Sequence, residues 1–124
     1  MAATVLVVED DRSIRALIYR MLLREGHQVL EASDGAIALE ILQAIPCDLV
    51  ITDFLMPKLS GIKFVEQLHS LQPQMPIILI TGYPAVSGTT IVDKVAEVLA
   101  KPFDLNMLRS TVHRLLTTTS HPST

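Results

Sequence analysis

Acidic residues follow two apolar segments of this chain, at the points where buried strands would end. The segment VLVV (5–8) leads into Glu9, Asp10 and Asp11, and DLVIT (48–52) leads into Asp53. Neighbouring carboxylates repel one another unless they are protonated or share a cation. Oxygen ligands of this kind suit Mg²⁺, which takes few protein carboxylates and keeps several waters. The pattern therefore indicates a site for Mg²⁺, or for Mn²⁺, built from acids far apart in the sequence.

A hydroxyl and an ammonium follow two further apolar segments. Thr81 ends PIILIT (76–81), and Lys101 follows EVLA (97–100). With a metal ion, such groups neutralise the oxygens of a phosphoryl group in transit, and a carboxylate such as Asp53 can form an acyl phosphate. Each residue alone has an ordinary explanation as a helix cap, a turn or a strand end. Their joint placement favours phosphoryl transfer.

Short apolar runs alternate with segments of helical period. We expect strands at 4–8, 27–32, 48–52, 76–81 and 97–100, and helices within 11–26 and at 33–44, 62–71 and 104–116, with a short or irregular helix within 82–98. This alternation predicts an α/β fold, a doubly wound (βα)5 three-layer sandwich with a parallel sheet. Residues that follow parallel strands meet at the carboxyl edge of the sheet, where ligands bind. The acids, Thr81 and Lys101 should therefore lie together.

Helix boundaries and faces are also readable. Asp10 or Asp11, Ser33 or Asp34, and Asp104 are suitable N-terminal caps, and Gly26 is a suitable C-terminal one. Two apolar stripes are expected to face the core: Ile14, Leu17, Ile18, Met21 and Leu22 in the first helix, and Ile62, Val65 and Leu68 in the third, with Phe64 as a further candidate. The arginines of the first helix lie mostly off that stripe: Arg12, Arg15, Arg20 and Arg24. We interpret them as a solvated face, with a docking surface for an acidic partner as the alternative.

Length and composition narrow the class of protein. The 124 residues suit one domain, expected at 1–116 with a flexible tail at 117–124. A net charge of −3 argues against a module that binds nucleic acid directly. The single cysteine, Cys47, suits a reducing compartment. No signal peptide and no membrane helix are recognisable, so we expect a cytoplasmic protein without a membrane partner.

Four motifs together carry a resemblance to a known family. VVEDD (7–11), DFLMPKLSG (53–61), LITG (79–82) and KPF (101–103) stand in an order and spacing that resemble the receiver domain of two-component response regulators, in the CheY-like superfamily. The resemblance covers about residues 4–116. It implies a flavodoxin-like sheet in the order 2-1-3-4-5.

The resemblance also implies roles for individual residues. Asp53 would be the phospho-acceptor. Asp10 would bind Mg²⁺ directly and Glu9 directly or through water, and Asp53 and the backbone carbonyl of Leu55 would complete the protein ligands. Thr81 and Lys101 would bind the phosphoryl group, and Pro102 would follow a cis peptide bond.

The implied activity is signalling. Asp53 would take its phosphoryl group from a histidine kinase or a histidine phosphotransfer protein, and a downstream protein partner, not identified by the sequence, would read the switched surface. The chain would assist its own phosphotransfer and slow self-dephosphorylation without being an enzyme for a separate substrate. Asp11 would belong to the helix start and not to the metal site.

Several positions depart from the family pattern. Val98 stands where many receivers carry an aromatic residue that moves with the threonine. Leu55 and Tyr83, with Gly82 beside Thr81, occupy positions that modulate the site, and Leu55 offers no polar group to orient an attacking water. We therefore expect slow self-dephosphorylation. The weakly patterned segment 82–98 indicates either an unusual output surface or a shortened loop.

Three other functions fit less well. A small-molecule aspartyl-phosphate phosphatase or phosphotransferase usually has a second acid where Leu55 stands, and a cap domain. A flavodoxin-like flavin protein needs Ser, Thr or Gly after the first strand, where EDD would repel phosphate without a metal. A receiver-like protein that is never phosphorylated is disfavoured because all five site residues are present.

Overall fold

The sheet is parallel and has the expected strand order. The computed structural model describes residues 2–53, 61–82 and 93–119. Its strands are β1 (Thr4–Val8), β2 (Gln28–Ala32), β3 (Leu49–Asp53), β4 (Ile77–Thr81) and β5 (Glu97–Ala100), in the order β2-β1-β3-β4-β5. The predicted α/β class and the order 2-1-3-4-5 are confirmed.

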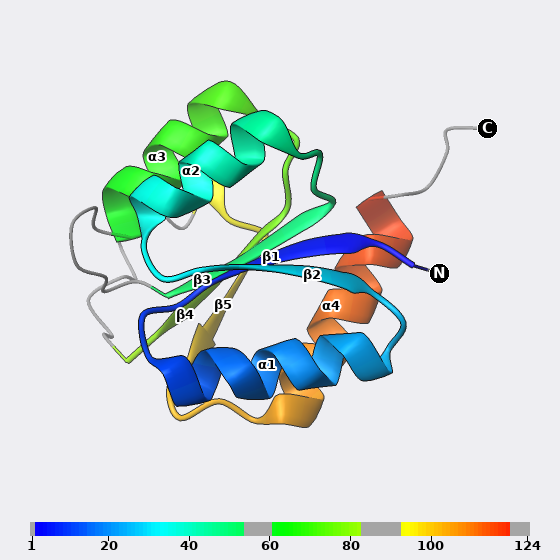
Figure 1. Cartoon of the computed structure of the whole chain (residues 1–124). Coiled ribbons are helices and arrows are strands. Elements are labelled where there is room, and N and C mark those ends of the chain that lie inside the picture. The colour runs from blue at the N-terminus through cyan, green and yellow to red at the C-terminus, as the bar shows by residue number, and fades with distance from the viewer. Residues whose placement is uncertain (1, 54–60, 83–92, 120–124) are drawn as a thin grey trace.

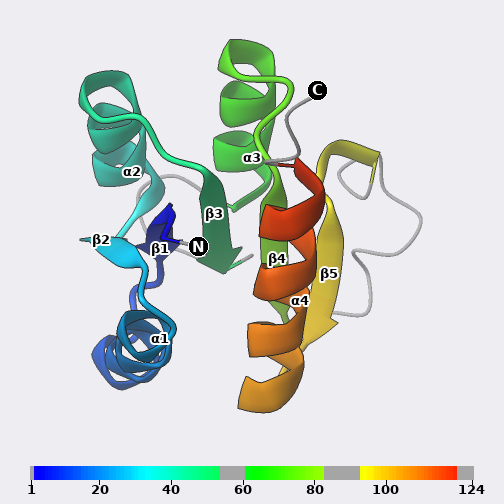
Figure 2. The same cartoon turned by 90° about the vertical axis from the view of Figure 1, so that its right-hand side faces the viewer.

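Helices cover both faces of the sheet. The described residues form α1 (Arg12–Arg24), α2 (Gly35–Ala44), α3 (Gly61–Leu71) and α4 (Leu105–Thr119). One face is covered by α1 and α4 and the other by α2 and α3, as Figure 1 and Figure 2 show. The irregular helix expected within 82–98 falls largely on residues outside those described. Among the described helices, all are too short or too polar to span a bilayer.

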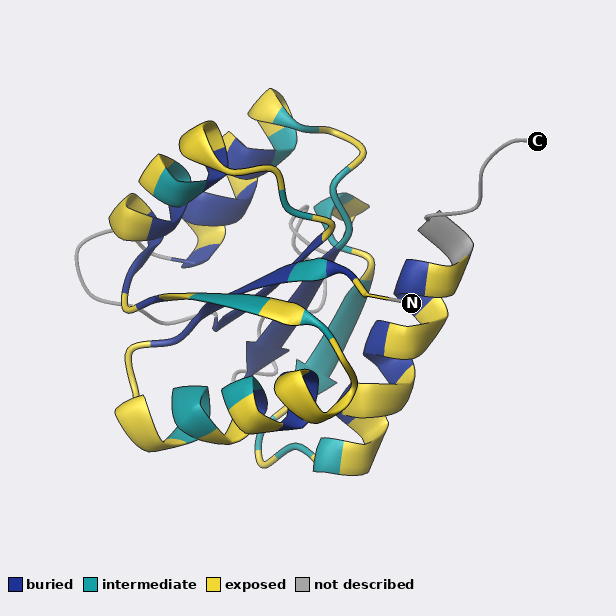
Figure 3. Cartoon of the chain, turned by 45° about the vertical axis from the view of Figure 1, so that its right-hand side comes forward, coloured by how far each residue is buried: buried dark blue, intermediate teal, exposed yellow. Residues whose placement is uncertain are grey.

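Two apolar clusters fill the spaces between the layers. Alternate residues of each strand point to opposite faces, so Ile78 packs toward α1 and α4 while Leu79 packs toward α2 and α3. Every residue of β3 and β4 is buried (Figure 3), whereas β2 and β5 at the sheet edges are only partly covered. This burial explains why the central strands read as unbroken apolar runs.

The helices begin and end at capping residues that the sequence predicts. The Asp11 carboxylate accepts hydrogen bonds from the backbone N–H groups of Ser13 and Ile14 at 2.9 and 3.0 Å. Asp34, the second of the two candidates, caps α2, and Asp104 caps α4. Gly26, at φ +88°, ends α1 in a left-handed conformation that favours glycine.

Two side chains expected in the core are exposed. Leu17 is 47% exposed and Ile62 36%. At 100° per residue, each is turned by about 100° from the centre of the buried side of its helix, which the fully buried neighbours define. In addition, α4 continues to Thr119, past the predicted end at residue 116, since no helix breaker stands before Pro122.

Candidate functional site

Four strands deliver polar side chains to one hollow at the carboxyl edge of the sheet. Glu9 and Asp10 follow β1, Asp53 and Thr81 are the last residues of β3 and β4, and Lys101 follows β5. The hollow is lined by all of these residues together with Asp11, Ile14 and Gly82. The structure thus brings together the acids, the hydroxyl and the ammonium that the sequence separates. The shared carboxyl edge of the parallel strands brings them together.

Lys101 joins two of the acids. Its Nζ lies 3.0 Å from Oδ2 of Asp53 and 3.7 Å from Oε1 of Glu9. The Glu9 and Asp53 side chains are only 3% and 8% exposed, so these ion pairs are shielded from water. One ammonium cannot neutralise three neighbouring carboxylates, and the site as a whole retains an excess of negative charge.

Burial makes Glu9 an unusual acid. Its pKa is raised from 4.5 to about 7, first because burial disfavours the charged form and also because the Asp53 carboxylate repels it. The backbone N–H of Asp11 and the charge of Lys101 oppose the rise. Burial alone would lower the pKa of Lys101, but the hydrogen bond to Asp53 and the charges of Glu9, Asp53 and Asp10 raise it. Lys101 is therefore firmly protonated.

The donor set fits a hard divalent cation. Carboxylate oxygens of Glu9, Asp10 and Asp53 lie within 4.8 Å of one another. Octahedral Mg²⁺ with bonds of about 2.1 Å places its ligand oxygens about 3–4 Å apart, so small side-chain rotations suffice to close the set. Asp10 is exposed, which leaves room for the waters that Mg²⁺ retains.

The turn that carries Glu9 and Asp10 is held by hydrogen bonds at several points. The Glu9 N–H donates to the carbonyl of Ala32 at 3.0 Å, and the Glu9 carboxylate accepts from the Asp11 N–H at 3.1 Å. Asp11 itself turns its carboxylate to the start of α1. Asp11 thus serves α1 through its side chain while its backbone supports Glu9.

Arg15 is a residue whose surroundings the sequence analysis predicts wrongly. It is not part of a solvated face: its side chain is 18% exposed, its guanidinium donates to the Glu9 carbonyl at 2.8 Å, and it pairs with Glu31 at 3.2 Å. The helical period alone does not single out Arg15, because Arg15 and Arg24 both lie about 90° from the centre of the apolar stripe read from the sequence. Measured from the residues that the structure buries on α1, namely Ile18, Met21 and Leu22, Arg15 lies at about 65° and the other three arginines lie beyond about 110°.

The remaining predicted positions divide into three groups. Gly82 lies next to Lys101, since a Cβ on Gly82 would sit 3.8 Å from that of Lys101, and the Lys101–Pro102 peptide bond is cis. Val98, opposite Leu79 in the sheet, packs partly buried against the cluster beneath α2 and α3. Leu55 and Tyr83 lie outside the described residues.

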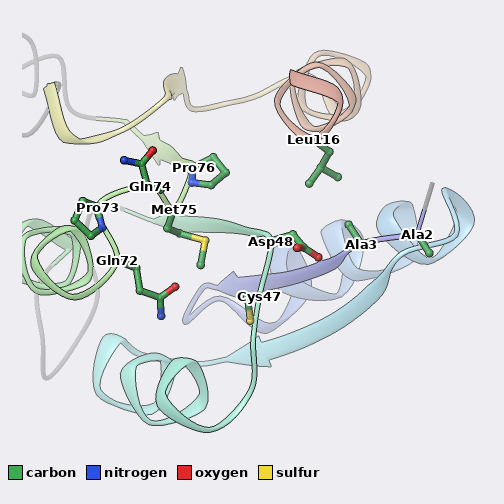
Figure 4. A pocket seen from close by; sticks show the side chains of 10 residues that line it. All are labelled: Ala2, Ala3, Cys47, Asp48, Gln72, Pro73, Gln74, Met75, Pro76 and Leu116. Atoms are coloured by element: carbon green, nitrogen blue, oxygen red, sulfur yellow. The ribbon is translucent and has the colours of Figure 1, made fainter. Parts of the chain in front are cut away.

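A second hollow lies at the other edge of the sheet and lacks this chemistry. Residues that precede β1, β3 and β4 line it, with Cys47 and Met75 among the side chains that Figure 4 labels. Burial raises the pKa of the Cys47 thiol, which disfavours the reactive thiolate. Asp48 is engaged there by the backbone N–H of Thr4 at 2.8 Å. The carboxyl edge is therefore the candidate site.

A doubly wound sheet with acids, a threonine and a lysine at its carboxyl edge is typical of flavodoxin-like proteins that accept phosphoryl groups on an acidic site. Comparison with known proteins specifies the family. Residues 5–113 match the response regulator receiver domain. The chain therefore belongs to the response regulator receiver family, and the prediction from its four motifs is confirmed.

Individual relatives agree with this membership. The response regulator receiver protein CpdR of Brucella abortus (strain 2308) is 34% identical over 90% of this chain and 95% of its own length. The sensor kinase CckA of the same strain is 34% identical over 93% of this chain, which spans 13% of that protein. The structure of the response regulator TrrA from Thermotoga maritima, in complex with Mg²⁺-BeF, has a TM-score of 0.85 and 30% identity over 91% of this chain and 98% of its own.

Proposed function

We propose that this chain accepts a phosphoryl group on Asp53 from the phosphohistidine of a histidine kinase or a histidine phosphotransfer protein. The observation that carries the proposal is the contact of 3.0 Å between Lys101 Nζ and Asp53, beside a set of carboxylate oxygens suited to a divalent cation. The likeness to CpdR and TrrA supports it.

The chemistry assigned to the chain is a single transfer. A carboxylate oxygen of Asp53 attacks phosphorus, the new O–P bond forms, and the P–N bond to the donor imidazole breaks with its electrons on nitrogen, which takes a proton from solvent. Lys101 pairs with a phosphoryl oxygen as negative charge builds there, and the Thr81 hydroxyl donates to another.

Glu9, Asp10, Asp53 and the backbone carbonyl of Leu55 would hold Mg²⁺, or Mn²⁺, in this reaction. When bound, the ion supplies positive charge to the phosphoryl oxygens and relieves the repulsion among the acids. The low exposure of Glu9 and Asp53 strengthens every charge interaction at the site, because water screens them poorly.

Phosphorylation would then act as a switch. A charge of about −2 arrives beside Lys101 and Thr81 and biases two states of the surface that a downstream protein reads. With Val98 in place of an aromatic residue, that bias has to travel without the ring movement of other receivers. Leu55, Gly82 and Tyr83 would set slow self-dephosphorylation. We place this role in the cytoplasm, which suits the free thiol of Cys47.

The test is a search for the acyl phosphate. The chain is incubated with Mg²⁺ and a small acyl phosphate donor, and intact mass is followed for one phosphoryl group that survives acid and is lost in base. The adduct should be absent from Asp53→Asn. An equal adduct on that variant would disprove the assignment of Asp53, and no adduct from any donor or kinase would favour a receiver that is not phosphorylated.

A further inference from the structure

Arg15 lies near the site, and its guanidinium contacts the backbone of Glu9 and not the carboxylates proposed to bind the metal. The guanidinium of Arg15, one turn into α1, donates from Nη1 to the backbone carbonyl of Glu9 at 2.8 Å. Its Nε donates at the same time to Oε1 of Glu31 at 3.2 Å. Glu31 lies on β2, the strand next to α1 in Figure 1. The arginine therefore ties a helix and an edge strand to one peptide group of the β1–α1 turn.

That peptide group has a particular position. The Glu9 carbonyl belongs to the peptide unit that joins Glu9 to Asp10, so its direction sets where the Asp10 Cα and side chain start. Glu9 is held on its other side by the hydrogen bond from its N–H to Ala32. With both of its backbone polar groups engaged, Glu9 has little freedom to rotate, and Asp10 inherits that restriction because planar peptides transmit orientation.

We propose that Arg15, anchored by Glu31, is a positioning residue for the metal site and fixes the peptide unit between Glu9 and Asp10. This inference rests on the proposed function in one respect, namely that Glu9 and Asp10 bind the metal. Outer contacts that orient ligands commonly affect metal affinity by about 10- to 100-fold.

Charge and position make opposite predictions for this residue. A guanidinium close to a cation site repels the cation, so removing its charge should tighten Mg²⁺ binding if electrostatics alone mattered. If Arg15 positions the acids, its removal should weaken Mg²⁺ binding in spite of the lost repulsion. The direction of the change in Kd therefore separates positioning from a general charge effect.

The experiment is a Mg²⁺ titration of the full chain by isothermal calorimetry, well below the unfolding temperature. Arg15→Gln should raise the Kd for Mg²⁺ by about tenfold or more, and Glu31→Gln should raise it less. The double variant of Arg15→Gln and Glu31→Gln should bind Mg²⁺ no more weakly than Arg15→Gln alone, because Glu31 acts through Arg15. Arg20→Gln, an equal charge change on the exposed side of α1, should leave Kd unchanged or slightly lower.

A second measurement separates positioning from mere stabilisation of the fold. The rate of adduct formation is measured against Mg²⁺ concentration. For Arg15→Gln the half-saturating Mg²⁺ concentration should rise, while the rate at saturation largely recovers. If the ion pair between Arg15 and Glu31 only stabilises the fold, its loss in Arg15→Gln would lower the melting temperature and leave the half-saturating Mg²⁺ concentration unchanged.

The possible results have separate meanings. A Kd for Arg15→Gln equal to or below that of the wild type overturns the positioning role. If that variant fails to fold, two other variants decide the question: Arg15→Lys, which keeps the charge without the two-sided contact, and Glu31→Gln. An unchanged Kd for Mg²⁺ in both of them overturns the positioning role. Asp10→Asn tests the premise: undiminished Mg²⁺ binding there defeats the proposed metal site itself and not the role of Arg15.

Discussion

Replacing Glu9 by Gln should stabilise the metal-free protein at neutral and alkaline pH. The Glu9 carboxyl is buried, and its pKa of about 7 lies above the ordinary value of 4.5 mainly because of that burial. Gln keeps the size of Glu and an oxygen that can accept from the Asp11 N–H, but it carries no charge. The substitution therefore removes the cost of ionising a buried acid and little else.

The sign and size follow from linkage. The folded chain holds the Glu9 proton more tightly than the unfolded chain does, so this group's contribution to stability is fully present below about pH 4.5 and is lost as pH rises through about 7. At about 1.4 kcal/mol per pH unit of pKa difference, the loss reaches about 3 kcal/mol by pH 8 and is about 1 kcal/mol at pH 5. The free energy of unfolding of Glu9→Gln should exceed that of the wild type by these amounts at the same pH values.

The assay is urea unfolding in EDTA at several pH values between about 5 and 8, with Glu40→Gln, an exposed acid on α2, as the matched control. Saturating Mg²⁺ should reverse the ranking, because the wild type has one more carboxylate for the ion, and ligand binding stabilises the folded state. If the free energies of unfolding of the wild type and Glu9→Gln run parallel across this pH range in EDTA, the reasoning about the burial of Glu9 is wrong.

Three further predictions concern single positions. Lys101→Gln should slow adduct formation by roughly 100-fold, as loss of one charge-stabilising donor does, yet bind Mg²⁺ at least as tightly because a repelling charge is gone; weaker Mg²⁺ binding would contradict the ion-pair geometry. Asp11→Ala should cost about 1 kcal/mol in urea unfolding through loss of the α1 cap, and a neutral result would show that the cap is dispensable. Leu55→Asn should shorten the lifetime of the phosphorylated form, followed by intact mass, since it adds a group that can orient water; a lifetime no shorter than that of the wild type would remove the hypothesis of slow self-dephosphorylation.

Much of this architecture is local and therefore readable from the chain. The β-branched and aliphatic run TVLVV places β1, and Asp11, Asp34 and Asp104 place the starts of three helices, because a short carboxylate side chain meets the unpaired N–H groups of a first turn wherever it stands. The alternation of strand and helix then implies a parallel sheet, and a parallel sheet brings the residues after its strands to one edge. The convergence of Asp10, Asp53 and Lys101 follows from that order alone.

Other features depend on distances between elements that no local pattern encodes. The pKa of Glu9 reflects how deeply the turn after β1 is covered and how near Asp53 of β3 comes to it. The role of Arg15 depends on Glu31, which only the pairing of β1 with β2 brings within reach of α1. Leu17 fits the apolar period of α1 but is exposed, because the packing of the helices selects which part of the stripe is covered. The sequence by itself determined which groups gather at the carboxyl edge, since the alternation of strands and helices and the helix caps are written in short-range patterns. Only the tertiary structure decided how each group is charged and held there, since burial and electrostatics are set by neighbours distant in the chain.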